Sequence, residues 1–191
     1  MLTPYQQHVH RWSTCQRCPL AHAGRTAVVL ARGKLPCDIL MVGEAPGASE
    51  DALGKPFVGP AGHLLDEITA QAIPEWIRLA YTNLVSCIPL DGIGNKVSEP
   101  EAECIRACQP RLLEFVKLCQ PKGIVLVGEL AERNFPKEAA RSVEHYAKIH
   151  HPAAILRANY AMQSIMRQRC LVALQGLVET LTSQGDQGAP F

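Results

Sequence analysis

Short apolar runs alternate with longer amphipathic stretches along most of this 191-residue chain. Apolar runs bounded by turn residues predict β-strands, and stretches whose apolar residues recur at helical spacing predict α-helices. Strands are expected at 37–42, 80–86, 123–128 and 143–149, and helices at about 3–14, 61–72, 99–118, 129–134 and 155–182.

This order of elements predicts an α/β fold with one parallel sheet. Strands that alternate with helices favour a sheet covered on both faces, because each helix crosses back over the sheet to the next strand. In such sheets the ligand crevice lies beyond the carboxyl ends of the strands. We expect a single domain over 1–183 and a flexible tail at 184–191.

Composition places few limits on function. A hydrophobic content of 47% and a mean hydropathy near zero are typical of a globular domain. The longest apolar runs are too short to span a bilayer, and the first residues do not form a secretory signal, so a cytoplasmic location is expected. A net charge of +1 neither indicates nor excludes nucleic acid, since a local basic patch can exist in a neutral total.

The chain has eight cysteines, an unusual number for a protein expected in the cytoplasm. Disulfides are rare in a reducing compartment, so clustered cysteines are better interpreted as metal or cluster ligands. Cys15 and Cys18 have C-x-x-C spacing, which allows two thiolates to share a metal centre. Cys87 follows a predicted strand, and Cys104 and Cys108 lie four residues apart on one helix face. A set of Cys15, Cys18 and Cys87 with one of the other two fits either zinc or an iron–sulfur cluster. The remaining cysteines are interpreted as small core residues: Cys37, Cys119 and Cys170.

Polar residues follow each predicted strand. The strands end in "GEAPG", "TNLVSC", "VGELA" and "KIHHP", which contribute Glu44, Asn83, Glu129 and the pair His150–His151. Because the carboxyl ends of parallel strands share one edge, these side chains are expected around one crevice. Glu129 opens a helix and is interpreted as a complement to that helix N-terminus instead.

Four of these segments, taken in order, resemble a known family. "GEAPGASEDALGKPFVGPAGHLLDE", "TNLVSC", "CQPRLL" and "HHPAAILR" are similar to the iron–sulfur, or family 4, uracil-DNA glycosylases of the uracil-DNA glycosylase superfamily. The resemblance runs from Cys15 to about Arg157. It implies a three-layer α/β/α sandwich around a four-stranded parallel sheet. It also implies a monomeric, monofunctional enzyme that flips uracil out of single- or double-stranded DNA and hydrolyses its N-glycosidic bond, initiating base excision repair.

The resemblance also implies roles for individual residues. Glu44 matches the carboxylate that acts near the sugar, and His151 matches the histidine that donates a hydrogen bond to uracil O2. Phe57 matches the aromatic that stacks on the extruded base, and Asn83 matches the amide that reads it. An amide offers a donor and an acceptor, so it can face uracil N3–H and O4 but not the donor at cytosine N4. The neighbours implied to line the same pocket are Gly43 and Ala45.

Other matched residues are expected to brace the site or to contact DNA. Glu50 and Asp51 match an acidic pair that we interpret as bracing the tight turn through backbone N–H groups. Gly59 and Gly62 begin the following helix and are expected to offer free backbone N–H groups to a phosphate. Arg157 is a further expected phosphate contact, beside the wedge that enters the duplex.

For the cysteines, the resemblance implies a structural [4Fe–4S] cluster, with zinc as the alternative. The pattern "CQPRL" matches the family's last ligand at Cys108. The twenty residues between Cys87 and Cys108 are more than family members usually have, which keeps Cys104 as the alternative ligand.

One segment departs from the family. After Cys87, relatives usually carry a basic, proline-rich stretch, whereas this chain has "IPLDGIGNKVSEPEAE", with Lys96 as its only cation. Weaker phosphate contact is expected there. The departure keeps two alternatives open: a glycosylase for another modified base, and a non-catalytic or covalent uracil-DNA-binding protein on the same fold. The covalent form is disfavoured, because the chain lacks the arginine-rich, histidine-bearing insertion of the relatives that trap the sugar.

Overall fold

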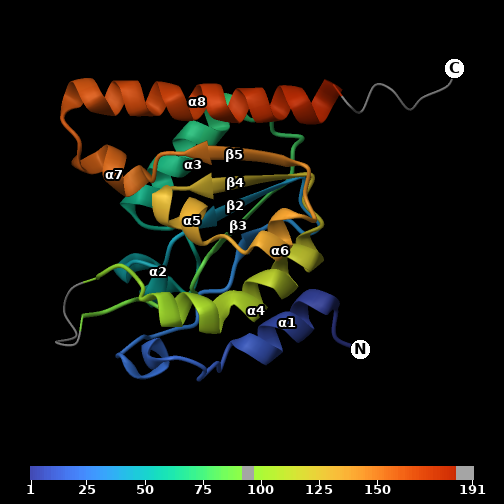
Figure 1. Cartoon of the computed structure of the whole chain (residues 1–191), viewed down its shortest axis with the longest axis vertical. Helices are drawn as coiled ribbons and strands as arrows, with labels where there is room; N and C mark the ends of the chain where they lie inside the picture. The colour runs from blue at the N-terminus through green and yellow to red at the C-terminus, as the bar shows by residue number, and fades with distance from the viewer. Residues whose placement is uncertain (92–96, 184–191) are drawn as a thin grey trace, which may run out of the picture.

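The computed structural model describes residues 1–91 and 97–183, and its centre is a twisted sheet of five strands in the order β1-β3-β2-β4-β5 (Figure 1). β2 pairs in parallel with β3 and with β4, and β4 pairs in parallel with β5. The four-stranded parallel sheet expected from the sequence is therefore confirmed. A two-residue strand, β1, adds an antiparallel edge beside β3. The strands are β1 (Arg32–Gly33), β2 (Ile39–Gly43), β3 (Leu79–Asn83), β4 (Gly123–Val127) and β5 (His145–Ile149).

Three helices cover one face of the sheet: α3 (Pro60–Ala72), α7 (Pro152–Arg157) and α8 (Tyr160–Ser183) (Figure 1). Ile39 and Met41 of β2 point into this layer, where they are buried with Leu65 of α3 and Leu174 of α8. Side chains at alternate positions of β2 therefore belong to one core. Among the helices of the described ranges, none is both long and apolar enough to cross a membrane.

The other face is covered by α4 (Ala102–Cys119), with α1 (Pro4–Trp12) lying on the outside of α4 (Figure 1). Leu40 and Val42 of β2 face this layer and are fully buried with Leu112 and Phe115 of α4. The arrangement is the expected α/β/α sandwich. Cys37, Cys119 and Cys170 are almost completely buried in the two apolar cores, as predicted. The shorter helices are η1 (Pro19–His22), α2 (Ala48–Leu53), α5 (Glu129–Asn134) and α6 (Lys137–Ala140).

Two predicted elements differ from the observed ones for local reasons. The helix expected at 155–182 is two helices, because Ala158 is extended and the Asn159 side chain accepts from Met162 N at 3.0 Å, where α8 begins. The strand expected at 80–86 ends at Asn83. The carbonyl oxygen of Asn83 accepts a hydrogen bond from the side chain of Arg111 on α4 instead of pairing with a neighbouring strand. The tail predicted at 184–191 and Lys96 lie outside the described residues.

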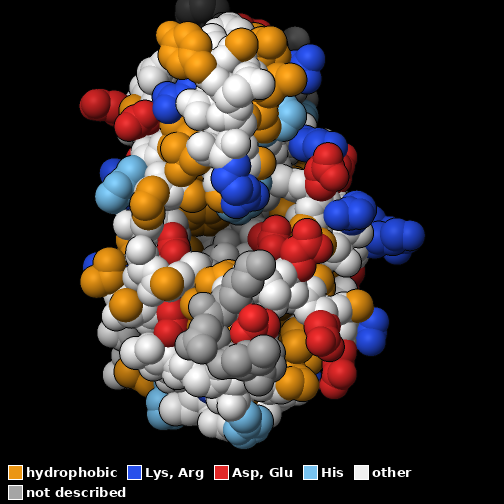
Figure 2. All heavy atoms as spheres, turned by 90° about the vertical axis from the view of Figure 1, so that its left-hand side faces the viewer, with side chains coloured by type: hydrophobic (Ala, Val, Ile, Leu, Met, Phe, Trp, Pro, Cys, Tyr) orange, Lys and Arg blue, Asp and Glu red, His pale blue; other side chains and the backbone are white. Residues whose placement is uncertain are grey.

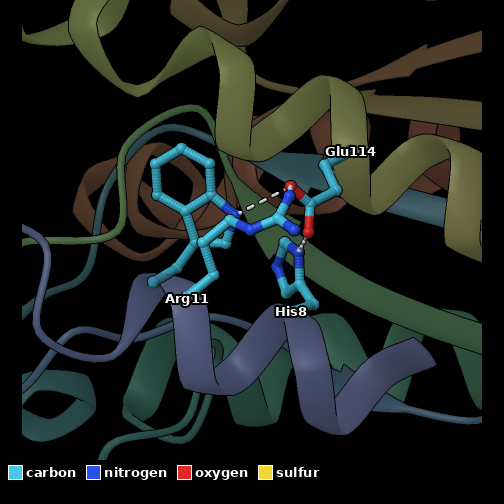
Figure 3. Close-up of polar contacts among 4 residues, drawn as sticks. His8, Arg11 and Glu114 are labelled. Atoms are coloured by element: carbon cyan, nitrogen blue, oxygen red, sulfur yellow. Dashed lines mark hydrogen bonds and ion pairs between the residues drawn. The ribbon is translucent and has the colours of Figure 1, made fainter. Parts of the chain in front are cut away.

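Helix α1 is held on α4 by one carboxylate that accepts three donors (Figure 3). Glu114 accepts from His8 Nδ1 at 3.0 Å, Arg11 Nη1 at 2.7 Å and Trp12 Nε1 at 3.2 Å. His8 is fully buried, and burial lowers its pKa even though Glu114 acts in the opposite direction. The contact fixes the end of α1, which leads directly to Cys15 and Cys18.

Candidate active site and cysteine cavity

The carboxyl ends of the parallel strands open onto a hollow in the middle of one face of the molecule (Figure 2). Glu44 follows β2, Asn83 ends β3, and His151 follows β5, so three strand ends contribute to this pocket. Phe57, from the loop between α2 and α3, and Arg157, at the end of α7, complete the set. The structure thus brings together five of the residues singled out from the sequence.

Gly43 leaves space at the floor of this pocket. It is the register partner of Asn83 in the neighbouring strand. A Cβ atom at Gly43 would lie 2.4 Å from Asn83 Oδ1 and 2.4 Å from Phe57 Cζ, which is closer than non-bonded atoms approach. The absence of a side chain therefore allows the phenyl ring and the amide to lie next to each other. Ala45, which follows Glu44 in the sequence, lines the same pocket.

Phe57 is held in a backbone conformation that bulky residues rarely adopt. Its φ is +56°, in the left-handed region, and its side chain is buried. Its ring contacts Tyr81 with centroids 6.0 Å apart, and Arg32 donates to the adjacent carbonyl of Pro56 at 2.9 Å. Gly62 lets the α3 backbone approach, since a Cβ there would lie 2.0 Å from Phe57 O. Such strain persists only where the surroundings fix it, and it is common at functional sites.

The acidic pair braces the loop, as predicted. Glu50 accepts from the N–H groups of Gly47 and Gly59, both at 3.1 Å. Asp51 is buried and accepts from Thr26 N at 2.7 Å and Ala27 N at 3.2 Å. The N–H of Gly59 is therefore engaged by Glu50 and is not free, contrary to the expectation from the sequence.

Glu44 is half-buried in the pocket, and its environment raises its pKa above the ordinary glutamate value. Burial is the main cause that raises its pKa, and the negative charge of Glu99 adds to the effect. The guanidinium groups of Arg157 and Arg133 act in the opposite direction. The carboxylate thus lies between an acidic and a basic neighbour at the edge of a partly desolvated pocket.

His151 is placed as a neutral hydrogen-bond donor. Its Nδ1 accepts from Ala153 N at 3.2 Å and caps α7. An Nδ1 that accepts carries no proton, so the neutral ring carries its proton on Nε2. Burial lowers the pKa of His151 and Arg157 lowers it further, which favours this neutral form.

The segment after Cys87 also contributes to the pocket, which the sequence pattern did not predict. Val97, Ser98 and Glu99 line the pocket opposite the strand ends. Ser98 is fixed there, because its N–H donates to Pro89 O at 2.8 Å. The unusual acidity of this segment was the available signal, but nothing in the sequence placed it over the pocket.

A second cavity lies on the α4 side of the sheet and is lined by Cys15, Cys18, Cys87 and Cys108, which we call the cysteine cavity. All four thiols are free. Arg25 Nη1 donates to Cys87 Sγ at 2.7 Å, and Arg25 Nη2 donates to Cys15 O at 2.5 Å. Burial nevertheless raises the pKa of Cys87 to about 11.

Cys104 packs in one small cluster with Cys18, Cys87 and Cys108 but does not line the cysteine cavity. It is buried against Leu20 and borders a different hollow, formed with Pro89 and Glu101. Within residues 1–91 and 97–183, no three side chains of His, Cys, Asp or Glu converge closely enough to hold a single metal ion.

Comparison with known proteins agrees with this geometry. A family profile described as the uracil DNA glycosylase superfamily matches residues 31–175, about three quarters of the chain. This chain belongs to the uracil DNA glycosylase superfamily. The matched range contains β1 to β5 and every residue of the candidate pocket described above.

Individual members of the superfamily are also similar over long stretches. A type-4 uracil-DNA glycosylase of Pyrobaculum aerophilum is 31% identical over 162 residues, covering 75% of this chain and 80% of that protein. One of Archaeoglobus fulgidus is 31% identical over 162 residues, covering 75% and 78%. One of Thermotoga maritima is 38% identical over 121 residues, covering 63% and 60%.

The contact at Gly43 gives a stability prediction with an internal control. Gly43→Ala should lower the free energy of unfolding by about 1–3 kcal/mol, because the added methyl group overpacks the contact between Phe57 and Asn83. Gly176→Ala, where a Cβ would meet nothing within 4 Å on helix α8, should raise it by about 0.5–1 kcal/mol. Urea denaturation of both variants measures the difference. Equal stabilities of the two variants would contradict the proposed crowding.

Proposed function

We propose that this protein is a monofunctional uracil-DNA glycosylase that extrudes uracil from DNA and hydrolyses its N-glycosidic bond, leaving an abasic site for base excision repair. The observation that carries the proposal is one pocket holding a carboxylate, a neutral histidine, an amide and an aromatic ring. The relatives named type-4 uracil-DNA glycosylases support it. A monomeric state and a cytoplasmic location are part of the proposal.

Breaking the glycosidic bond places positive charge on the sugar and negative charge on the departing uracil. Glu44 is proposed to stabilise the sugar cation and to orient the attacking water, which requires the ionised carboxylate. His151 is proposed to donate from Nε2 to uracil O2 as the negative charge grows. A neutral donor suffices, because the hydrogen bond strengthens as the oxygen becomes more basic.

Base recognition is assigned to Phe57 and Asn83. The buried ring of Phe57 offers a stacking surface, and the adjacent amide of Asn83 offers one donor and one acceptor. Uracil presents the complementary O4 and N3–H, whereas cytosine presents a donor at N4 and no proton at N3. The amide therefore discriminates by leaving cytosine with unpaired polar groups.

Contact with the duplex is assigned to α7. Arg157 is exposed at the pocket mouth and is proposed to bind a phosphate. Its neighbour Leu156 is 43% exposed, which suits an apolar wedge that occupies the space left by the extruded base. Contacts of Gly59 and Gly62 with DNA stay predictions. Gly62 is buried against Phe57, and the Gly59 N–H is engaged by Glu50.

The cysteine cavity is proposed to hold a structural [4Fe–4S] cluster on Cys15, Cys18, Cys87 and Cys108. In such a cluster each thiolate binds a different iron, whereas zinc needs all its ligands about 2.0–2.3 Å from one ion. Four thiols line this one cavity, which is the set of ligands that such a cluster takes. When bound, it would cross-link the segment after α1 to the loop after β3 and to α4, and hydrolysis needs no electron from it.

The activity test is release of uracil from single- and double-stranded oligonucleotides that contain one uracil, read as strand scission after alkali. Wild-type protein should cleave both. In its pH–rate profile, the acid limb, where the rate falls as the pH is lowered, should lie above the ordinary glutamate pKa of about 4.3, because the Glu44 pKa is raised. Glu44→Gln should lower kcat by about 10²–10⁴-fold and remove that limb.

The outcome also decides between the alternatives. Absence of scission at stoichiometric protein would refute the hydrolase proposal. An SDS-stable protein–DNA band would indicate a covalent binder, and scission only with another modified base would change the assigned substrate. An unchanged kcat in Glu44→Gln would remove Glu44 from the mechanism.

The ligand assignment can be tested separately on purified protein. Cys108→Ala should lose most of the iron and acid-labile sulfide, together with the broad visible absorbance of an iron–sulfur cluster, because one corner of the cluster loses its ligand. Cys104→Ala is the matched control on the same helix and should retain them. The reverse result would assign the fourth ligand to Cys104.

A further inference from the structure

Arg111 is the largest fully buried side chain among the described residues, with 1% of its surface exposed. It lies on α4 one turn after Cys108 and reaches across to the end of β3. Its Nη1 donates to Thr82 Oγ1 at 2.7 Å, and its Nη2 donates to the carbonyls of Asn83 at 2.5 Å and Leu84 at 2.9 Å. The guanidinium therefore holds the backbone that carries the proposed base-reading amide.

The charge of Arg111 has no counter-ion in the described part of the chain. None of the ion pairs found there includes it, and its Nε is buried without a hydrogen-bond partner. A buried, unpaired cation costs several kcal/mol. The position of the side chain indicates what offsets this cost, because Arg111 lines the cysteine cavity.

We propose that Arg111 is a positioning residue that couples the group bound in the cysteine cavity to base recognition at Asn83. This inference rests on the proposed function. The four thiolates and the inorganic sulfides of a [4Fe–4S] cluster together outweigh the positive charge of its iron atoms, so a cysteine-bound cluster is an anion and would supply the missing counter-charge. The same guanidinium then fixes the Asn83 and Leu84 carbonyls through Nη2, while Nη1 holds Thr82 Oγ1.

Arg25 offers a comparison, because it contacts only one of the two sites. It donates to Cys87 Sγ and to Cys15 O but has no contact with β3. Arg25 should thus influence the cluster alone, whereas Arg111 should influence both the cluster and the base pocket. Arg106, exposed on the same helix as Arg111 and bordering a different hollow, influences neither.

The test compares Arg111→Met, Arg111→Lys, Arg25→Met and Arg106→Met as holoproteins. Cluster properties are read as the reduction potential and as the rate of cluster loss to an iron chelator. Base recognition is read as KM and kcat on a uracil oligonucleotide. Because the cluster becomes more negative on reduction, removing a nearby cation should lower the potential and speed cluster loss.

Arg111→Met should lower the potential, lose its cluster about ten- to a hundredfold faster, and raise KM. Arg111→Lys keeps the charge but lacks the planar fork that reaches Thr82 Oγ1 and the two carbonyls at once, so its potential should stay near wild type while KM rises. Arg25→Met should change the cluster readouts and leave KM unchanged, and Arg106→Met should match wild type throughout.

Unchanged potential and cluster loss in Arg111→Met would overturn the charge role, and unchanged KM in Arg111→Lys would overturn the coupling to Asn83. The lysine variant keeps the inference testable if the methionine variant does not fold. The cluster readouts need no excision. If wild-type protein releases no uracil, the proposed function fails while the potential still decides whether Arg111 acts on the cluster.

Discussion

Parallel pairing of β2 with β3 and β4, and of β4 with β5, is the constraint on which the rest of the structure depends. It brings the carboxyl ends of four strands to one edge, so that Glu44, Asn83 and His151 reach one pocket although they are far apart in the sequence. At the same edge, the pairing of Gly43 with Asn83 creates the space in which an amide and a phenyl ring meet. The chemistry of the site follows from this register.

The segment after β3 connects the two cavities. Asn83 lines the pocket at the carboxyl ends of the strands, and Cys87, four residues later, lines the cysteine cavity. α4 contributes Cys108 and the buried Arg111 to this connection, and Glu114 of the same helix holds α1 in place. A structural group bound by the cysteines would thus stabilise the backbone that presents Asn83, without taking part in the reaction.

Most of the fold could be predicted from the sequence, because it depends on local pattern. Buried strands such as β2 and β4 read as short apolar runs, and Gly43, Glu44 and Phe57 stand in a distinctive run of glycines, prolines and acids. The bracing role of Glu50 also followed from local chemistry, since two carboxylates in one turn need backbone donors.

What could not be predicted depends on contacts between distant segments. The presence of Glu99 in the same pocket as Glu44 and the engagement of the Gly59 N–H by Glu50 are set by tertiary packing. Arg111 is part of the motif "CQPRL", and nothing in the sequence distinguishes it from a surface arginine. Only its burial without a counter-ion indicates a role. The split between α7 and α8 depended on a single side-chain cap at Asn159.

The central claim is that the pocket at the strand ends reads uracil through the amide of Asn83. The most direct measurement is the ratio of cytosine to uracil release from matched oligonucleotides by Asn83→Asp and wild-type protein. A carboxylate at this position accepts from cytosine N4 and repels uracil O4, so the account predicts that the ratio rises by about ten- to a hundredfold. A ratio equal to that of wild type, with uracil release retained, would contradict it.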